Sequence, residues 1–139
     1  MQRDKSLGLL SISRKGGNIV LGEEQVGAQA RASRARLVLL ASDAGGHTVR
    51  RAKSFVAGTA QPLITLPYTK DELGDALGTT SCAIAAITDV RLAQAFVKTL
   101  PDAREHTELL QELDTRVKRV EQRRAEEKAH RRNVRYGKK

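Results

Sequence analysis

Side chains that could carry out catalysis are few and far apart in this sequence. There is one cysteine, Cys82, and none of the three histidines lies near it in the sequence. Metal sites and cysteine nucleophiles need such groups to converge. The adjacent acids Glu23 and Glu24 could form a general acid–base pair, but neighbouring positions on a helix point about 100° apart. We therefore interpret this pair as favourable negative charge at a helix N-terminus.

A nucleotide-phosphate motif is also missing. The glycine pair Gly16-Gly17 is followed by the β-branched run 19–21, whereas a phosphate-binding P-loop needs Lys and Ser or Thr at the start of a helix. The sequence therefore predicts a protein that is not an enzyme, with no cofactor and no metal.

The charge balance favours a polyanionic partner. The 139 residues include 25 Lys and Arg but only 16 Asp and Glu, a net charge of +9. Aromatic residues make up only 3%, which argues against an extensive stacking platform for single-stranded bases. The longest apolar runs have about five residues, and a membrane span needs about 20. With a single cysteine and no apolar leader after the N-terminus, we expect a cytoplasmic protein without a membrane partner.

Charge divides the chain near Pro101. Residues 1–100 hold 13 basic and 8 acidic side chains, residues 101–114 hold one and five, and residues 115–139 hold 11 and three. This pattern predicts a domain over residues 1–100. It also predicts a charged helical extension over residues 101–139, basic from residue 115.

The body of the chain alternates between short apolar runs and helical patterns. Thr48, Thr69 and Thr88 are predicted helix N-caps, and Glu72 completes a capping box with Thr69. The predicted strands are 19–21, 37–41, 63–66 and 83–87, and the predicted helices are 4–13, 23–32, 48–55, 70–77 and 89–100.

These strands are apolar along nearly their whole length, so the sheet should be covered on both faces. We predict an α/β fold, a three-layer α/β/α sandwich around a central four-stranded mixed sheet, followed by a long basic C-terminal helix.

Four blocks of the body, in order, resemble one known family. They are residues 14–26 (RKGGNIVLGEEQV), 35–44 (ARLVLLASDA), 68–78 (YTKDELGDALG) and 83–89 (AIAAITD). Together they resemble the kink-turn-binding ribosomal protein superfamily of the "L-seven-Ae" type, and within it the small bacterial ribosomal-protein-like branch. The resemblance spans about residues 5–100. It implies an α/β/α sandwich that binds structured RNA and has no catalytic activity.

The resemblance also implies a site. Family members hold a bent RNA helix with a glycine and the polar helix N-terminus after it, here Gly22 and residues 23–25. A glycine allows close backbone approach, and a helix N-terminus offers free N–H groups. Family members typically have Asn at the position of Glu24 and Lys at that of Ala28. A second contact is the loop 78–83. The candidate RNA-binding residues of the body are Arg14, Lys15, Gly22, Glu23, Glu24, Gln25, Asp43, Ser81 and Cys82.

The C-terminal segment has two parts. Leu110, Leu113, Val117 and Val120 form an apolar stripe, too short for an independent coiled coil, that should pack on the body or on a partner helix. Beyond Val120 the segment is basic and has no apolar face, so alone it should fray or be disordered. We interpret it as an arm that follows RNA phosphates. Its candidate contact residues are Arg123, Arg124, Arg131 and Arg132.

The sequence thus predicts a monomeric, non-enzymatic protein that binds structured RNA, either rRNA or a regulatory RNA. The role would be that of a ribosomal protein or ribonucleoprotein component in translation or ribosome assembly, with ribosomal proteins as further partners. One alternative is a protein-interaction module that uses the 110–120 stripe and keeps only a vestigial kink-turn site. Another is a small α/β hydrolase or transferase, although no side chains converge as its chemistry would need.

Overall fold

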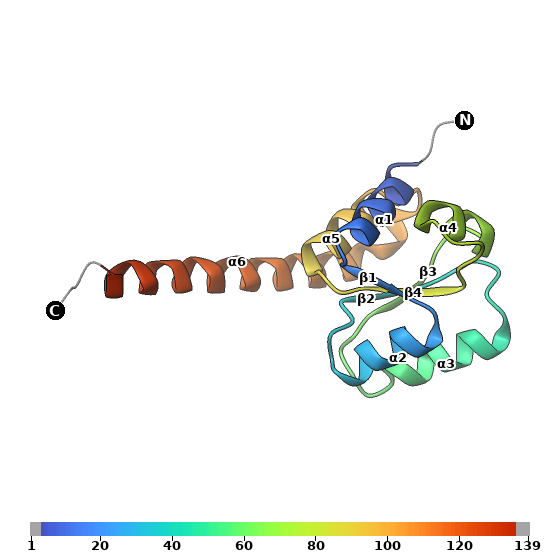
Figure 1. Ribbon diagram of the computed structural model, residues 1–139, viewed down its shortest axis with the longest axis horizontal. Coiled ribbons are helices and arrows are strands. Elements are labelled where there is room, and N and C mark those ends of the chain that lie inside the picture. The colour runs from blue at the N-terminus through green and yellow to red at the C-terminus, as the bar shows by residue number, and fades with distance from the viewer. Residues whose placement is uncertain (1–3, 136–139) are drawn as a thin grey trace.

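The structure is a computed structural model that describes residues 4–135. It is an α/β fold in which helices flank a four-stranded mixed sheet and a long helix closes the chain (Figure 1). The elements are α1 (Lys5–Lys15), β1 (Ile19–Leu21), α2 (Glu23–Arg31), β2 (Leu37–Leu40), α3 (Gly46–Val56), β3 (Leu63–Thr65), α4 (Lys70–Leu77), β4 (Ile84–Ile87), α5 (Val90–Lys98), the 3-10 turn η1 (Ala103–His106) and α6 (Thr107–Arg135).

The sheet has the strand order β1-β4-β2-β3. β2 runs parallel to β3, and β4 runs antiparallel to both of its neighbours. The C-terminal ends of β1, β2 and β3 therefore meet the start of β4 at one end of the sheet. We call this the Gly22 end, after the residue that follows β1. The opposite end, where β1 begins and β4 finishes, is called the Asn18 end.

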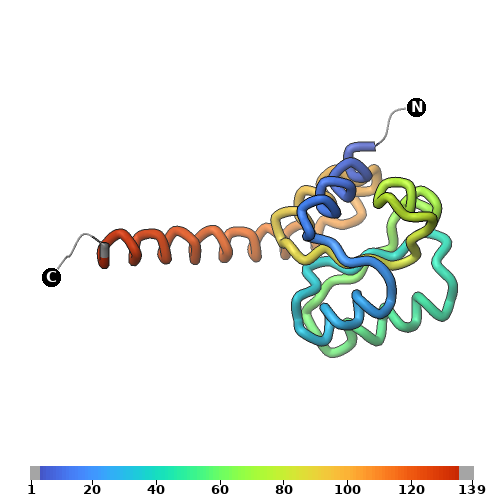
Figure 2. The backbone as a smooth tube through the Cα atoms, in the orientation of Figure 1, coloured from blue at the N-terminus to red at the C-terminus, as the bar shows by residue number. Residues whose placement is uncertain are grey.

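Both faces of the sheet are covered, as the apolar strands predicted. All four residues of β2 are buried. Leu37 and Leu39 point into a core shared with α1, α4, α5 and the start of α6, whereas Val38 and Leu40 point into a smaller core under α2 and α3. Successive side chains of a strand point to opposite faces of the sheet, so this one buried strand contributes to both cores. Figure 2 shows the two groups of helices on opposite sides of the strands.

One predicted helix cap is confirmed and two are wrong. Thr69 and Glu72 form the predicted capping box at the start of α4. At α3 the helix begins earlier than predicted, with Gly45 as N-cap, so Thr48 lies inside the first turn. At α5 the cap is Asp89, whose carboxylate accepts hydrogen bonds from the backbone N–H of Arg91 and Leu92. Thr88 instead extends the strand pairing, since its N–H donates to the Asn18 carbonyl.

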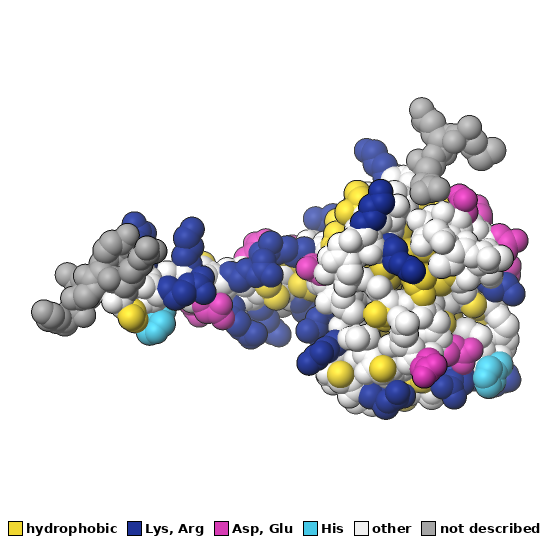
Figure 3. Space-filling view, viewed as in Figure 1, with side chains coloured by type: hydrophobic (Ala, Val, Ile, Leu, Met, Phe, Trp, Pro, Cys, Tyr) yellow, Lys and Arg dark blue, Asp and Glu magenta, His cyan; other side chains and the backbone are white. Residues whose placement is uncertain are grey.

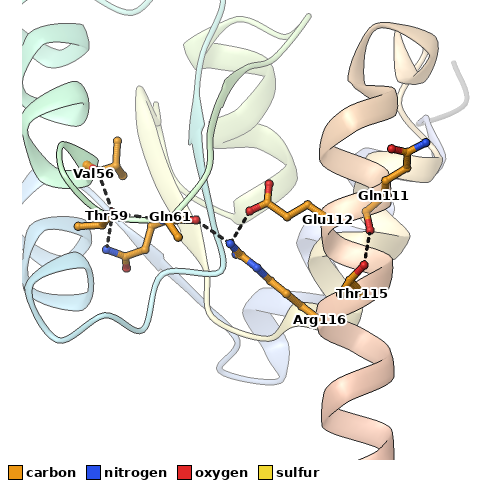
Figure 4. A network of polar contacts seen from close by, with 8 residues as sticks. Val56, Thr59, Gln61, Gln111, Glu112, Thr115 and Arg116 are labelled. Carbon is orange, nitrogen blue, oxygen red and sulfur yellow. Dashed lines mark hydrogen bonds and ion pairs between the residues drawn. The ribbon is translucent and has the colours of Figure 1, made fainter.

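The first half of α6 packs on the body. Leu113 is fully buried and Val117 nearly so, both in the core beneath α5. Arg116 adds a polar tether, because its guanidinium donates to the Ala60 carbonyl at 2.8 Å and to Glu112 Oε1 at 2.6 Å (Figure 4). The prediction that the apolar stripe packs on the body is confirmed for Leu113 and Val117, whose side chains are covered by the body, whereas Leu110 and Val120 are only partly buried.

The second half of α6 leaves the body. We call residues 121–135 the arm; it projects as a straight helix from the Asn18 end (Figure 1). All of α6 has 29 residues, about 43 Å at 1.5 Å per residue. The helix extends to Arg135. Residues 136–139, the end of the segment that the sequence predicts to fray or be disordered alone, lie outside the described part of the chain. Within the described residues no helix is long and apolar enough to cross a membrane.

A polar cluster fixes the start of α1. Asp4 caps this helix and accepts hydrogen bonds from the backbone N–H of Ser6 at 2.9 Å and from the Tyr68 hydroxyl at 2.7 Å. The Ser6 and Tyr68 hydroxyls also bond to each other. Burial acts to raise the pKa of Asp4, but these hydrogen bonds outweigh it and leave the pKa below its usual value. Burial, together with the charges of Asp4 and Asp102, raises the pKa of Tyr68 to about 12.

Candidate nucleic-acid interface

Three segments converge at the Gly22 end of the sheet. The backbone N–H of Gly22 donates to the Ile84 carbonyl at 3.0 Å, and that of Ala41 donates to the Ala83 carbonyl at 2.9 Å. These bonds place the N-terminus of α2 and the loop after β2 beside the loop that leads into β4. The predicted contacts that the structure brings together here are Gly22, Glu23, Glu24, Gln25, Asp43, Ser81 and Cys82.

Gly22 has a backbone conformation that only glycine adopts readily. Its φ is 88° and its ψ is 156°, and nothing lies within 4 Å of where a Cβ would be. A side chain would therefore meet open space, yet it would strain the backbone by about 1–3 kcal/mol. The residue is exposed, and as N-cap it gives α2 no side-chain hydrogen bond. The first N–H groups of α2 thus face solvent beside an open backbone, an arrangement suited to an anionic or carbonyl acceptor.

Glu23 is engaged within the protein. Its Oε1 lies 2.9 Å from Arg51 Nε and 3.8 Å from His47 Nε2, and its Oε2 accepts a hydrogen bond from the Thr48 hydroxyl at 3.2 Å. The side chain is only 31% exposed. Glu23 therefore holds α2 against the start of α3, a structural role added to its predicted effect on the helix dipole. Sequence reasoning missed these three partners, which are 24 to 28 residues away.

Glu24 and Gln25 are the free side chains at this end. Both are exposed, and in the described part of the chain neither has a hydrogen bond or an ion pair. Ala28 is also exposed, one helical turn beyond Glu24 and therefore on the same face. A carboxylate and a methyl group thus occupy the positions from which side chains could reach a ligand bound at the α2 N-terminus.

The other two segments are firmly held. Asp43 Oδ1 accepts a hydrogen bond from the Lys70 backbone N–H at 2.8 Å, which ties the loop after β2 to the start of α4. In the loop before β4, Ser81 is exposed but Cys82 is buried, and its thiol donates to the Ile84 carbonyl. Burial raises the pKa of the Cys82 thiol. Of this predicted pair, Ser81 alone has a side chain that is open to a ligand.

A glycine that sequence reasoning missed shapes this loop. A Cβ on Gly74 would lie 2.7 Å from the Cα and N of Ser81, so the loop rests directly on the backbone of α4. The only sequence signal was a glycine inside an otherwise regular helix, a position where glycine weakens the helix by about 1 kcal/mol relative to alanine.

The remaining predicted contacts lie elsewhere. Arg14 and Lys15 are exposed in the last turn of α1, just before the Asn18 end, although the charge of Arg14 still acts on the Cys82 thiol. The four arginines of the arm are exposed beyond the Asn18 end, so the structure separates them from the α2 N-terminus. They are Arg123, Arg124, Arg131 and Arg132.

Comparison with known proteins supports the fold. No family model matches the chain, and no curated protein matches its sequence. Among solved structures, a Bacillus halodurans C protein of unknown function superposes with a TM-score of 0.65 at 25% identity, covering 70% of this chain and 97% of the other. The Giardia lamblia 15.5kD RNA binding protein superposes with a TM-score of 0.59 at 18% identity, covering 76% of this chain and 92% of the other. The chain thus shares its fold with an RNA-binding protein.

Proposed function

We propose that this protein binds structured RNA through the Gly22 end of its sheet and has no catalytic role. The observation that carries the proposal is the open backbone at Gly22 beside the exposed first turn of α2, in a fold shared with the Giardia RNA-binding protein. Hydrogen bonds from Gly22 and Ala41 to the β4 segment, and from Lys70 to Asp43, hold the surrounding loops in a fixed shape. Such a surface suits recognition of a bent RNA backbone by shape.

The net charge of +9 supports this proposal, and the arm would add affinity that does not depend on sequence. The finer role, association with rRNA and ribosomal proteins during ribosome assembly, rests on the family resemblance of the body. Sequencing of RNA crosslinked to the protein in cells tests that role. Recovery of mRNA or tRNA fragments without enrichment of rRNA would contradict it.

The direct test follows backbone amides during titration with RNA. An RNA duplex bent by an internal loop should shift the NMR amide signals of residues 22–26 and 78–83 in the full-length protein. Signals that move only in the arm would overturn the proposed role of the Gly22 end.

A side-chain variant provides the quantitative test. Gln25→Ala removes a free amide at the site and should weaken binding of the bent RNA about three- to tenfold, since one hydrogen bond contributes about 0.5–1.5 kcal/mol. Gln111→Ala, at an exposed position near the start of α6, is the matched control and should bind as the wild type does. Gln25 is preferable to Gly22 for this test, because any side chain at Gly22 also strains the fold.

A further inference from the structure

One face of α6 changes from apolar to cationic along its length. Leu113, Val117 and Val120 pack on the body at spacings of four and three residues. The same rhythm continues beyond them through Arg124, Lys128 and Arg131, which fall four, eight and eleven residues after Val120. Because a helix repeats every 3.6 residues, these three cations lie on the face that packs against α5 in the first half. The face that docks the helix therefore continues past the body as a row of cations, joined by Arg132 and flanked by Glu121 and Glu127, each about 60° around the helix from Arg124.

The cations of this row are free, unlike those nearer the body. In the first half of α6, Arg116 pairs with Glu112, and Lys118 pairs with Asp114 at 3.0 Å. Within the described residues, the side chains of the row form no ion pair and are exposed. Glu126 lies on the opposite face and accepts a hydrogen bond from Gln122. Figure 3 shows Lys and Arg both along the arm and on the adjoining end of the body.

The row meets two further arginines where the arm leaves the body. A hollow of about 160 Å³ at the Asn18 end is lined by Arg36, Arg91, Val120 and Arg124, with residues 88–90. One carboxylate, Asp89, also lines this hollow, and it caps α5. A second, Glu121, lies 4.0 Å from the lining residue Arg91. Arg36 uses one guanidinium nitrogen on the Ser33 carbonyl and is otherwise open.

We propose that this inner corner, formed by the cationic face of α6 with Arg36 and Arg91, binds the phosphate backbone of an RNA duplex. It is a second RNA site, at the opposite end of the sheet from Gly22, and the protein therefore bridges two RNA segments. The inference rests on the proposed function for the choice of RNA as ligand. Evenly spaced free cations suit a repeating row of phosphates, and the basic face has no Leu, Phe or Trp with which to enter a membrane.

The first experiment compares two faces of the same helix. The probe is an unbent 12-base-pair RNA duplex, which offers phosphates but no bend. Arg124→Gln with Arg131→Gln removes two charges from the inner face, and Lys118→Gln with Arg119→Gln removes two from outside it. Lys118 and Arg119 are exposed, are not among the predicted RNA contacts, and lie about 120° and 140° around the helix from Arg124.

We expect the inner-face pair to weaken duplex binding at least tenfold and to reduce the slope of log K against log salt by about 2. The control pair should weaken binding no more than threefold. Equal losses of affinity in the two pairs would overturn the proposed site at the inner corner. They would show that the arm binds RNA without preference for one face of α6. No loss in either pair would show that the arm does not bind RNA.

A second experiment tests the body side of the corner and the bridging. Arg36→Gln should weaken duplex binding three- to fivefold, and a change within error of the wild type would remove Arg36 from the site. A donor-labelled bent RNA and an acceptor-labelled straight duplex should show energy transfer only when both bind one protein molecule. The inner-face pair should abolish this transfer while binding of the bent RNA persists. Transfer that survives the inner-face pair would overturn the bridging.

These outcomes separate the two proposals. If the Gly22 end does not bind RNA, the straight duplex still distinguishes the inner-face pair from the control pair. If the corner fails, the amide shifts at residues 22–26 are unaffected.

Discussion

The two regions proposed to bind RNA, the Gly22 end and the arm, have opposite kinds of surface. At the Gly22 end the carboxylates Glu23, Glu24 and Asp43 accompany a backbone held in one conformation by hydrogen bonds. In the arm the backbone is a plain helix, and its 15 residues carry six Lys and Arg against three Glu. The first surface can select by shape but attracts phosphate poorly, whereas the second attracts phosphate but has no shape to select with. The two should therefore respond differently to salt, to RNA bending and to mutation.

The largest effect should come from removing the arm. If it neutralises about six phosphates, log K for RNA falls against log salt with a slope of about −4 to −5. Deleting residues 121–139 should flatten this slope by several units and weaken binding of a straight duplex by about 100-fold at low salt. Leu113 and Val117 remain, so circular dichroism should show a folded body with an unchanged unfolding midpoint. A slope that survives the deletion would place the phosphate contacts on the body instead.

A tenfold gain in RNA affinity, instead of a loss, should come from two substitutions in the first turns of α2. Glu24→Asn with Ala28→Lys removes a negative charge and adds a positive one on a single exposed face. A well-made contact to a charged group contributes about 1.5–3 kcal/mol, so affinity for a kink-turn RNA should rise at least tenfold. The wild type should distinguish that RNA poorly from an unkinked duplex. Gel-shift titration at fixed salt measures all four combinations.

The control for this gain carries the same charge change elsewhere. Glu108→Asn with Ala57→Lys alters two exposed positions away from α2 and should raise both affinities equally and slightly. Tight, kink-selective binding by the wild type would show that Glu24 is tolerated at the site. If the α2 variant gains no affinity for the kink-turn RNA, the loop 78–83 or α6 recognises that RNA instead.

The smallest effect on RNA should come from a change to a buried side chain that is not among the candidate contacts. Tyr68→Phe removes the hydroxyl that bonds to Asp4 and Ser6, which should lower the free energy of unfolding by about 1–2 kcal/mol. Because this cluster lies at the start of α1, affinity for either RNA should stay within twofold of the wild type. Urea unfolding and gel shifts measure the two quantities. A large loss of RNA affinity would show that α1 contributes to the Gly22 end.

The same cluster predicts a dependence of stability on pH. Burial holds the pKa of Tyr68 near 12 in the folded chain, above its ordinary value of 10.0. The stabilisation is therefore complete below pH 10 and is lost as pH rises toward 12. The pKa of Asp4 is lowered, so its contribution is present above the ordinary value of 3.8 and is lost as pH falls through the folded value. Tyr68→Phe should remove the alkaline part of this profile. Identical alkaline profiles for variant and wild type would contradict it.

Local signals in the sequence predicted much of this fold. The capping box of Thr69 and Glu72 and the four apolar strands needed only neighbouring residues, and all are found. The α3 cap was predicted wrongly because the helix begins at Gly46, two residues before Thr48. Its N-cap is Gly45, which has no side chain to form a capping hydrogen bond. The α5 cap was predicted one residue too early, because the Thr88 N–H takes part in strand pairing and Asp89 caps the helix.

The site was harder to predict than the fold, because it depends on which strands are neighbours. Because β1 and β4 are neighbours in the sheet, Gly22 lies beside the segment that leads into β4. The strand order also places the arm at the opposite end of the sheet. The spacing of residues in the sequence does not reveal either arrangement. The partners of Glu23 come from α3 and depend on how two helices pack. The cationic face of α6 was visible in the sequence, since the rhythm of Leu113, Val117 and Val120 continues unbroken to Arg124. Apolar periodicity alone ends at Val120 and does not reveal this continuation.

The docking of α6 on α5 also governs whether the arm is helical. In a free peptide the first helical turn is unfavourable, with a nucleation constant of about 10⁻³. Isolated helices shorter than about 12–15 residues are therefore only marginally stable in water. The arm avoids that step, because Leu113 and Val117 already hold the preceding turns in place and each further residue only propagates them. Ala125 and Ala129, strong helix formers, favour this growth. Helicity in the arm thus depends on the hydrophobic core, and a cavity opened beneath α5 would melt the arm although the altered residue does not touch it.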